Sequence, residues 1–430
     1  MASATIILAY ALLGVALGTL TGLLPGLHVN SVAFLLVGVA PSVDGPPAAV
    51  GAAVLAAGVV HTFLSIVPGL VLGVPDAATA PGALPGHRLV LAGRGREAIR
   101  LSALGSGVAL VVAAGVALPL SRAVAAGRDW LLAALPVLLA IVAAALVLAE
   151  PTRRSRLGGV LCLAVATALG FLTLDLPAQG VLTPEGAASM LAPIFGGLFG
   201  APVLLDAVDA DGMIPEQDGA TLGLSRTETL RAAVSGVGGG ALVGYLPGVS
   251  AGVAAVLALG GAGGSGPAGR GSDRAYVVAT SGADTATAVF AVASLAVLGA
   301  PRSGVTVALS SLVAGGSAGT KEVPGSATTA AGGPLALPEM LLVIVFAAGL
   351  AIAVLVTVGE RYLLVVRRLP RQPLVVAVLA LLLALAVGFA GALGGAVFCL
   401  AAVVGLLPPR VGARRVHLMG VLFGPIVLGG

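Results

Sequence analysis

Charged residues are scarce in this chain. Only 9% of its 430 residues are Asp, Glu, Lys or Arg, whereas an ordinary soluble domain carries about 25%. Hydrophobic residues make up 58% of the chain, the mean hydropathy is +1.11, and apolar runs recur from one end to the other. The shortage of charge excludes a soluble protein and predicts an all-α polytopic membrane protein, with helices of about 20 apolar residues.

The residues that build catalytic and metal sites are also few. The chain has two cysteines and four histidines, and Cys162 and Cys399 lie far apart inside apolar runs, where we expect buried small side chains. His28 and His61 lack a nearby cysteine or carboxylate cluster, so they make a weak metal pair. No phosphate-binding loop and no Ser-His-Asp arrangement is present. We therefore expect no catalytic residues, no metal, no cofactor and no ATP-driven chemistry.

Glycine, by contrast, is abundant, with 64 residues. Two Pro-Gly steps, at Pro25 and Pro247, interrupt apolar runs at 21–31 and 243–253. A break at membrane depth leaves backbone groups without partners unless it lines a cavity or binds something polar. Paired breaks in corresponding positions of two half-chains are typical of the substrate site of a secondary transporter.

The two halves match at two places. Residues 21–36 and 243–258 share six of sixteen positions, including Leu-Pro-Gly, and 71–79 matches 297–305 through Val-Leu-Gly and a proline. The spacing between the two prolines is 50 residues in one half and 54 in the other. Both matches, in the same order and at nearly equal spacing, indicate an internal repeat.

Charge placement predicts that the repeat is inverted. The loop at 86–100 carries four arginines, whereas its counterpart at 320–339 carries one lysine and two glutamates. By the positive-inside rule these equivalent loops lie on opposite faces. We expect a first membrane repeat at 1–205, an acidic solvated loop at 206–228 and a second membrane repeat at 229–430, together forming one integral membrane domain.

About 10 to 14 transmembrane or re-entrant helices fit the apolar runs. We expect a broken region at 68–85 and helical segments near 4–24, 27–41, 47–67, 99–120, 129–149, 157–174, 187–205, 229–246, 248–262, 275–298, 303–319, 338–358, 372–390, 392–408 and 415–429. Four arginine-rich loops share the cytoplasmic face only if an odd number of the central segments is re-entrant, and the short 248–262 is the candidate. His87 and His417 adjoin these loops and are expected to be ordinary interface residues.

Polar residues near the breaks are the candidates for function, because ionisable groups in apolar segments are costly. The expected substrate-binding residues are Pro25, Gly26, His28, Asn30, Ser31, Pro247, Gly248, Ser250, Arg302 and Ser303. Arg302 could hold a carboxylate through its planar fork. The alternative is a structural ion pair between Arg302 and Asp76, which occupy equivalent positions in the two halves.

The expected coupling-ion residues are Asp76, Asp284 and Thr285. Asp284 and Thr285 lie in a segment rich in hydroxyl groups, and hydroxyl and carboxylate oxygens are the ligands that hard cations prefer. The alternative places this segment at the start of a helix, where Asp284 would cap free backbone amides. The two roles are compatible.

Three stretches resemble the large permease subunit of the tripartite tricarboxylate transporter family, most closely its divergent, largely archaeal branch. They are TGLLPGL after residue 20, 67–102 and 281–309, and the resemblance spans most of 14–320. It implies a many-helix carrier for small carboxylates that works with a small membrane subunit and an extracytoplasmic binding protein. The positions that match the family's motifs are Pro25, Gly26, Pro68, Gly69, Gly299, Pro301 and Ser303.

The chain departs from the family's pattern at several positions. His28 replaces a glycine after Pro-Gly-Leu, His87 lies where Tyr is usual before the basic loop, Asp284 and Thr285 stand for a usual pair of asparagines, and Arg302 replaces a common glycine. The resemblance still predicts the fold, but these changes mean that it does not by itself predict the substrate or a dependence on the partner subunits.

These observations predict a multi-pass permease of the plasma membrane, not an enzyme, that moves a small organic anion such as a di- or tricarboxylate. Na⁺ or H⁺ is the expected coupling ion. Membrane lipid and a second copy of the chain are the remaining expected partners, and no nucleic acid is expected. An intramembrane enzyme or lipid-handling protein that uses His28, His61 and Asp76 is the alternative.

Overall fold

The structure is a computed structural model of the chain. The residues that it describes are 4–25, 27, 29, 32–33, 36, 45–73, 83–182, 190–208, 214–219, 221–245, 270–299, 303–312 and 335–429.

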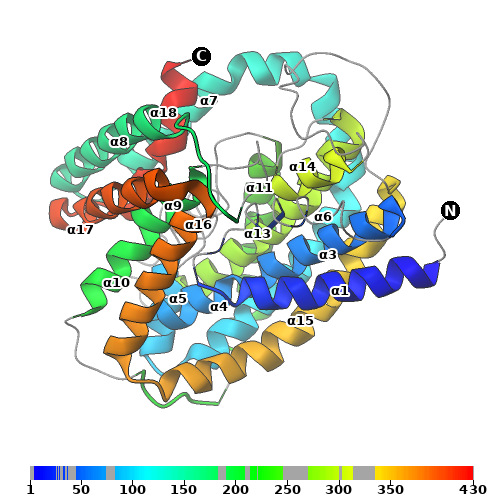
Figure 1. Ribbon diagram of the computed structural model, residues 1–430, viewed down its shortest axis with the longest axis horizontal. Helices are drawn as coiled ribbons and strands as arrows, with labels where there is room; N and C mark the ends of the chain where they lie inside the picture. The colour runs from blue at the N-terminus through cyan, green and yellow to red at the C-terminus, as the bar shows by residue number, and fades with distance from the viewer. Residues whose placement is uncertain are drawn as a thin grey trace.

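The described helices form two bundles that lie side by side (Figure 1). The first bundle contains α1 (Ala4–Gly22), α3 (Pro47–Leu64), α4 (Ile66–Leu72), α5 (Ala83–Leu91), α6 (Gly95–Ala126), α11 (Arg226–Tyr245), α13 (Arg270–Leu298), α14 (Gly304–Ser311) and α15 (Leu337–Arg367). The second contains α7 (Arg128–Leu148), α8 (Arg153–Thr173), α9 (Leu191–Phe195), η3 (Gly196–Gly200), α10 (Ala201–Val208), α16 (Arg371–Gly405), α17 (Leu407–Val411), η4 (Arg415–Met419) and α18 (Gly420–Leu428).

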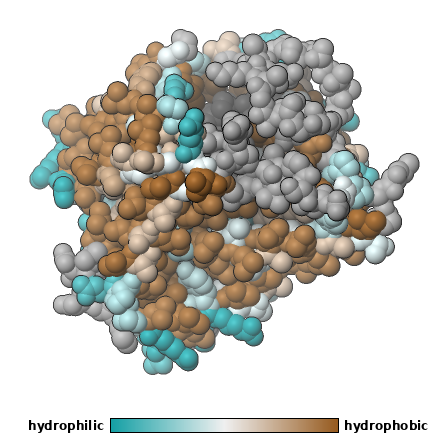
Figure 2. Space-filling model, viewed as in Figure 1, coloured by the Kyte–Doolittle hydropathy of each residue, from teal (hydrophilic) through white to brown (hydrophobic). Residues whose placement is uncertain are grey.

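Seven helices in the described part of the chain are long and apolar enough to cross a membrane. On the face that Figure 2 shows, the described surface is predominantly hydrophobic, and hydrophilic residues lie at the lower and left margins, in a strip near the top and at the right. A lipid-facing surface produces this pattern, because charged side chains are tolerated mainly where helices leave the hydrocarbon layer. The predicted all-α, multi-pass membrane protein is confirmed.

The two halves of the sequence interleave in space. Each half contributes its first part to the first bundle and its last part to the second bundle, so that α1–α6 pack with α11–α15, and α7–α10 pack with α16–α18. Equivalent helices also repeat the same neighbours. In the order of the two halves, α1, α3 and α6 correspond to α11, α13 and α15. The helix α1 packs on α3, and likewise α11 packs on α13. Across the halves, α13 packs on α6, and likewise α3 packs on α15.

Equivalent helices run in opposite directions. The path from α3 through α4 ends beside α5, where the His87 imidazole contacts the Leu70 carbonyl. The helix α13 instead begins at that face, because Arg274 pairs with Glu97 in the first turn of α6. Since α3 runs toward this face and α13 runs away from it, the two halves have opposite orientations, as the charge placement predicted.

Glycine sets the closest helix contacts. Gly14, Gly18 and Gly22 of α1 lie against the backbone or Cβ atoms of α3, where an added Cβ would come within 2.7 Å of a neighbouring atom. In the second half, α11 presents Gly236, Gly240 and Gly244 to α13 in the same way. Small residues that allow backbones to approach are the usual basis of helix association in lipid.

The four arginine-rich loops come together at one face. Ion pairs that join them, or join them to neighbouring helix ends, are Arg100–Glu360, Arg367–Glu216, Arg415–Asp206 and Arg414–Glu150. By the positive-inside rule this face is cytoplasmic. Residues 248–262, the expected re-entrant segment, lie outside the described residues.

Several helix boundaries differ from those expected. Pro68 and Gly69 are buried inside α4, so the expected break at 68–85 does not begin until after Leu72. Proline is tolerated there because it lies in the first turn of α4, where its missing N–H would have no helical partner. The helices α10 and α11 each extend three residues into the expected 206–228 loop. The boundary expected between 390 and 392 coincides with a kink at Gly391, inside α16.

The two cysteines differ in environment. Cys162 is fully buried, as expected. Cys399 is exposed on α16, so the prediction that it is buried is wrong. An apolar run does not reveal which face of a membrane helix meets lipid instead of protein, because both environments favour apolar residues.

Candidate functional site

The first Pro-Gly break lies where the two bundles meet. Pro25 is buried at the end of α1, and Leu27 and Val32, which follow it, pack with Phe389 of α16. Phe389 immediately precedes the kinked segment around Gly391. The break is therefore in contact with the second bundle.

His61 is fixed beside this break. Its Nδ1 atom lies 3.1 Å from the Thr21 hydroxyl, and the side chain is fully buried. The Thr21 hydroxyl donates to the Leu17 carbonyl, so its hydrogen is already engaged and the imidazole N–H donates to the Thr21 oxygen. His61 is thus a buried, hydrogen-bonded residue that joins α1 to α3.

A matching pair of glycines ends the central helices of both halves. Gly73 after α4 has φ 71° and Gly299 after α13 has φ 63°. Both belong to the repeated Val-Leu-Gly motif, and both adopt the left-handed conformation that favours glycine over other residues. The repeat therefore extends to backbone geometry: a glycine in the same conformation ends each of two oppositely directed helices.

Asp284 lies in the middle of α13, which begins at Arg270. The alternative in which Asp284 caps a helix N-terminus is wrong, because fourteen residues of helix precede it. Hydroxyl groups surround this stretch of α13. Ser281 donates to the Ser102 hydroxyl at 2.9 Å, and Ser106 donates to the Ser281 carbonyl at 3.3 Å.

Thr285 is buried and Asp284 is partly exposed. When the two Val-Leu-Gly motifs are aligned, Gly299 with Gly73, Asp284 of α13 corresponds to Gly58 of α3. Gly58 packs against Val305 of α14. The carboxylate therefore has no equivalent in the first half. The two halves share a backbone plan but differ in chemistry at its centre.

Ser303 begins α14. Its hydroxyl accepts from the Thr306 amide, while the Thr306 hydroxyl accepts from the Ser303 amide. This reciprocal capping satisfies backbone donors at the helix start. The helix α14 also contacts α3 through Val305 and Gly58, so the second motif of one half touches the central helix of the other.

The remaining predicted site residues lie outside the described residues. They are Gly26, His28, Asn30, Ser31, Asp76, Pro247, Gly248, Ser250 and Arg302. The expected ion pair between Asp76 and Arg302 is among them. Of the predicted set, the structure places Pro25, Asp284, Thr285 and Ser303, all in the first bundle.

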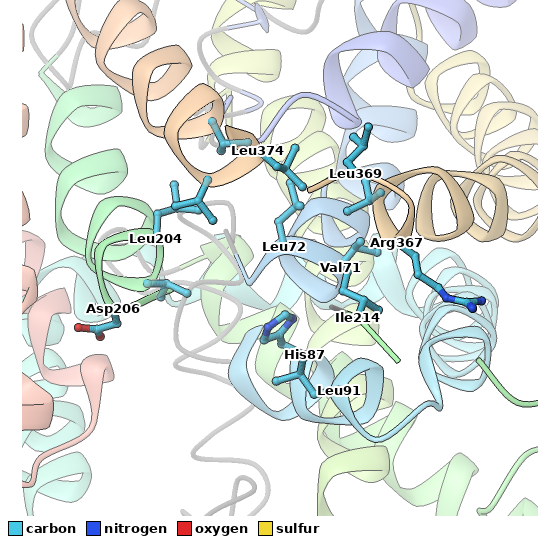
Figure 3. Close-up of a pocket in the computed structure, with 14 residues that line it drawn as sticks. Val71, Leu72, His87, Leu91, Leu204, Asp206, Ile214, Arg367, Leu369 and Leu374 are labelled. Carbon is cyan, nitrogen blue, oxygen red and sulfur yellow. The ribbon is translucent and has the colours of Figure 1, made fainter. Parts of the chain in front are cut away.

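A pocket of about 250 Å³ lies between the bundles near the arginine-rich face. In Figure 3, His87 points toward its centre among leucine and valine side chains, and Asp206 and Arg367 lie at opposite edges with their charged ends directed outward. The His87 Nδ1 donates to the Leu70 carbonyl at 2.8 Å. Sequence reasoning did not find this pocket, because most of its lining is apolar and comes from segments far apart in the sequence.

Glu97 forms a buried ion network that sequence reasoning also missed. It is 2% exposed, and its carboxylate accepts from Arg274 Nε at 2.7 Å, Arg94 Nε at 2.6 Å and the Gly223 amide at 2.6 Å. These bonds tie α6 and α13 to the segment that connects the two halves. The sequence feature that could have predicted this network is Glu97, the one acidic residue among the four arginines of 86–100.

His417 is fully buried, so its expected role as an ordinary interface residue is wrong. Its Nε2 lies 2.9 Å from a carboxylate oxygen of Glu150, which is also buried and pairs with Arg414. Burial lowers the pKa of His417 despite the neighbouring carboxylate. A charged imidazolium would also leave the Nδ1–H without an acceptor among the described residues, which agrees with a neutral ring.

Among the described residues, no group of three or more His, Cys, Asp or Glu side chains is placed to hold a metal ion. Of the described polar groups, the Thr21 hydroxyl and the His61 imidazole lie beside the first break, and the Asp284 carboxylate lies in the hydroxyl-rich stretch of α13.

The sequence model of the tripartite tricarboxylate transporter TctA family matches residues 8–420. The chain belongs to this family. It is a family of transporters, and this TctA-family chain is a multi-pass membrane protein. The resemblance inferred from the three motifs is confirmed and extends over the C-terminal helices.

An uncharacterized protein of Methanocaldococcus jannaschii is 30% identical over 202 residues, which cover 46% of this chain and 48% of the relative. The chain thus aligns with about half the length of that protein. No solved structure matches the chain.

Proposed function

We propose that this TctA-family chain is the permease of a secondary transporter that carries a small organic anion, a di- or tricarboxylate, across the plasma membrane. Family membership supports a carboxylate substrate and a tripartite system. A small membrane subunit and an extracytoplasmic binding protein are the proposed partners, and Na⁺ or H⁺ is the proposed coupling ion.

The observation that carries this proposal is the position of the first break between two bundles. A carrier must expose its substrate site to each side in turn, and a site at the meeting of two rigid bodies achieves this by their relative movement. Leu27 and Val32 pack against α16, so a shift of the second bundle would change the surroundings of the break.

The proposed substrate site comprises the two breaks and the start of α14. Its residues are Pro25, Gly26, His28, Asn30, Ser31, Pro247, Gly248, Ser250, Arg302 and Ser303. The start of α14 favours an anion, because the helix dipole presents partial positive charge there. Asp76, Asp284 and Thr285 are the proposed coupling-ion residues.

Uptake into proteoliposomes tests the proposal directly. Purified protein would be supplied with labelled carboxylates under separate Na⁺ and pH gradients, with and without a candidate binding protein. Gradient-driven accumulation of one acid would support a secondary carrier and identify its ion. Failure with every acid, gradient and partner, in folded protein, would contradict it.

Asp284→Ala tests the coupling role. We expect this variant to fold and to lose cation-dependent uptake, because the carboxylate is the charged oxygen ligand in the hydroxyl-rich stretch of α13. Thr357→Ala is the control, since among the described residues this exposed hydroxyl bonds only to carbonyls of its own helix, α15. Unchanged cation dependence in Asp284→Ala would remove Asp284 from the coupling site.

A further inference from the structure

A groove lies on the surface of the first bundle, and its lining includes none of the residues proposed for the transport site. It has a volume of about 660 Å³ and lies between α6 and α15, and Leu222 of the connecting segment also lines it. Its lining is apolar apart from Arg100. Ala103, Gly107 and Val111 of α6 and Ile352 of α15 form its walls.

The groove has the depth of one membrane leaflet. It extends along α6 from Arg100 to Val112, which at 1.5 Å per residue is about 18 Å. The hydrocarbon core of a bilayer is about 30 Å thick, so that one leaflet is about 15 Å. Because Arg100 belongs to the arginine-rich face, the groove spans the leaflet on that side.

The mouth of the groove carries excess positive charge. The Arg100 and Arg96 side chains share one carboxylate, that of Glu360, at 3.0 Å and 4.0 Å. Both arginines are partly exposed, and Arg96 Nε forms no hydrogen bond with any described residue. Two arginines and one glutamate therefore leave one net positive charge at the end of the groove that Arg100 lines.

From these features we infer that the groove binds an anionic phospholipid, with the phosphate at Arg96 and Arg100 and one acyl chain between α6 and α15. Basic sites between transmembrane helices on the cytoplasmic side are suited to anionic headgroups. The apolar walls would accept the chain of any phospholipid. Selectivity for an anionic lipid therefore comes from the arginine pair.

Such a lipid would also contact the connection between the halves. Leu222 lies in the segment whose neighbour, Gly223, is bonded to Glu97. The occupied groove would pack Leu222 against an acyl chain and leave it less exposed. We expect lipid binding to raise the thermal stability of the protein as well as to fill the groove, since a ligand that binds only the folded state stabilises it.

Native mass spectrometry of the purified full chain tests the inference. The protein would be mixed with equal amounts of phosphatidylglycerol and phosphatidylcholine, and bound lipid of each kind would be counted. We expect a clear preference for phosphatidylglycerol, and we expect Arg100→Gln to weaken its binding roughly fivefold. Inorganic phosphate in a parallel sample should neither displace the lipid nor raise the thermal stability.

Gly107→Leu tests the acyl-chain part without touching the charges. An added Cβ at Gly107 would lie 3.5 Å from Ile352, an ordinary contact, so the longer side chain can enter the groove. Gly115→Leu is the matched control on the same helix, because nothing lies within 4 Å of its added Cβ. Gly107→Leu should reduce phosphatidylglycerol binding and Gly115→Leu should not.

Equal binding of the two lipids, or binding by Gly107→Leu as strong as by Gly115→Leu, would overturn the inference. If Arg100→Gln fails to fold, the two glycine variants and the lipid preference of the unmodified protein still decide it.

Discussion

The Glu97 network provides a quantitative test of how the two halves are held together. Replacing Glu97 with alanine removes two bonds from Arg274, one from Arg94 and one from the Gly223 amide. Arg274 is only 7% exposed, so the variant removes the carboxylate that pairs with this buried charge. Breaking a buried ion pair in this way costs about 3–5 kcal/mol, and we expect Glu97→Ala to lower the free energy of unfolding by that amount.

The assay is reversible unfolding in lipid bicelles, with the free energy of unfolding as the readout. Arg274→Ala and the double variant complete a double-mutant cycle, in which the double variant should be less destabilised than the sum of the single variants by about 1–3 kcal/mol. Glu216→Ala is the control, because its pair with Arg367 is exposed and exposed pairs contribute less than about 1 kcal/mol. Additive costs for Glu97 and Arg274 would refute the reasoning.

Two further predictions concern other contacts. Gly240→Ala should lower the free energy of unfolding by about 1–3 kcal/mol, because its Cβ would lie 2.6 Å from atoms of Ala283 and Ala286. Gly238→Ala on the same helix is the control and should be neutral, because nothing lies within 4 Å of its added Cβ. Equal effects of the two variants in thermal unfolding would contradict this packing. Burial places the folded-state pKa of His417 below its ordinary 6.5, so the unfolded chain takes up a proton at this site more readily than the folded protein. The stability that neutral His417 contributes is therefore complete above pH 6.5 and is lost as the pH falls toward the folded-state pKa. His417→Gln should flatten this acid dependence of the melting temperature, and an unchanged profile would argue against it.

The sequence predicted the fold class and the repeat because both depend on patterns along the chain. Apolar length marks the crossings, and the paired Val-Leu-Gly motifs end equivalent helices at Gly73 and Gly299. The boundary near residue 391 was predictable because an apolar run too long for one crossing contains a glycine-rich stretch.

Other features depend on contacts between distant segments. The cluster of hydroxyls around Asp284 resembles a helix start in sequence, yet the helix begins at Arg270, because the preceding polar residues are stabilised by Glu97 and other residues of the first half. Burial of His417 depends on Glu150, which is 267 residues away. A single sequence gives no sign of such pairs, and therefore it cannot reveal that the two halves share both bundles.

The interleaving of the halves has a consequence for biogenesis. During synthesis, α6 enters the membrane long before α13, the helix against which it packs, and α8 enters long before α18. Neither bundle can close until the last helices have been inserted. During synthesis, the early helices therefore lie in lipid with their polar and small-residue faces unpacked until their partners are inserted. Truncation after the first half should leave two incomplete bundles, which membrane quality control would degrade.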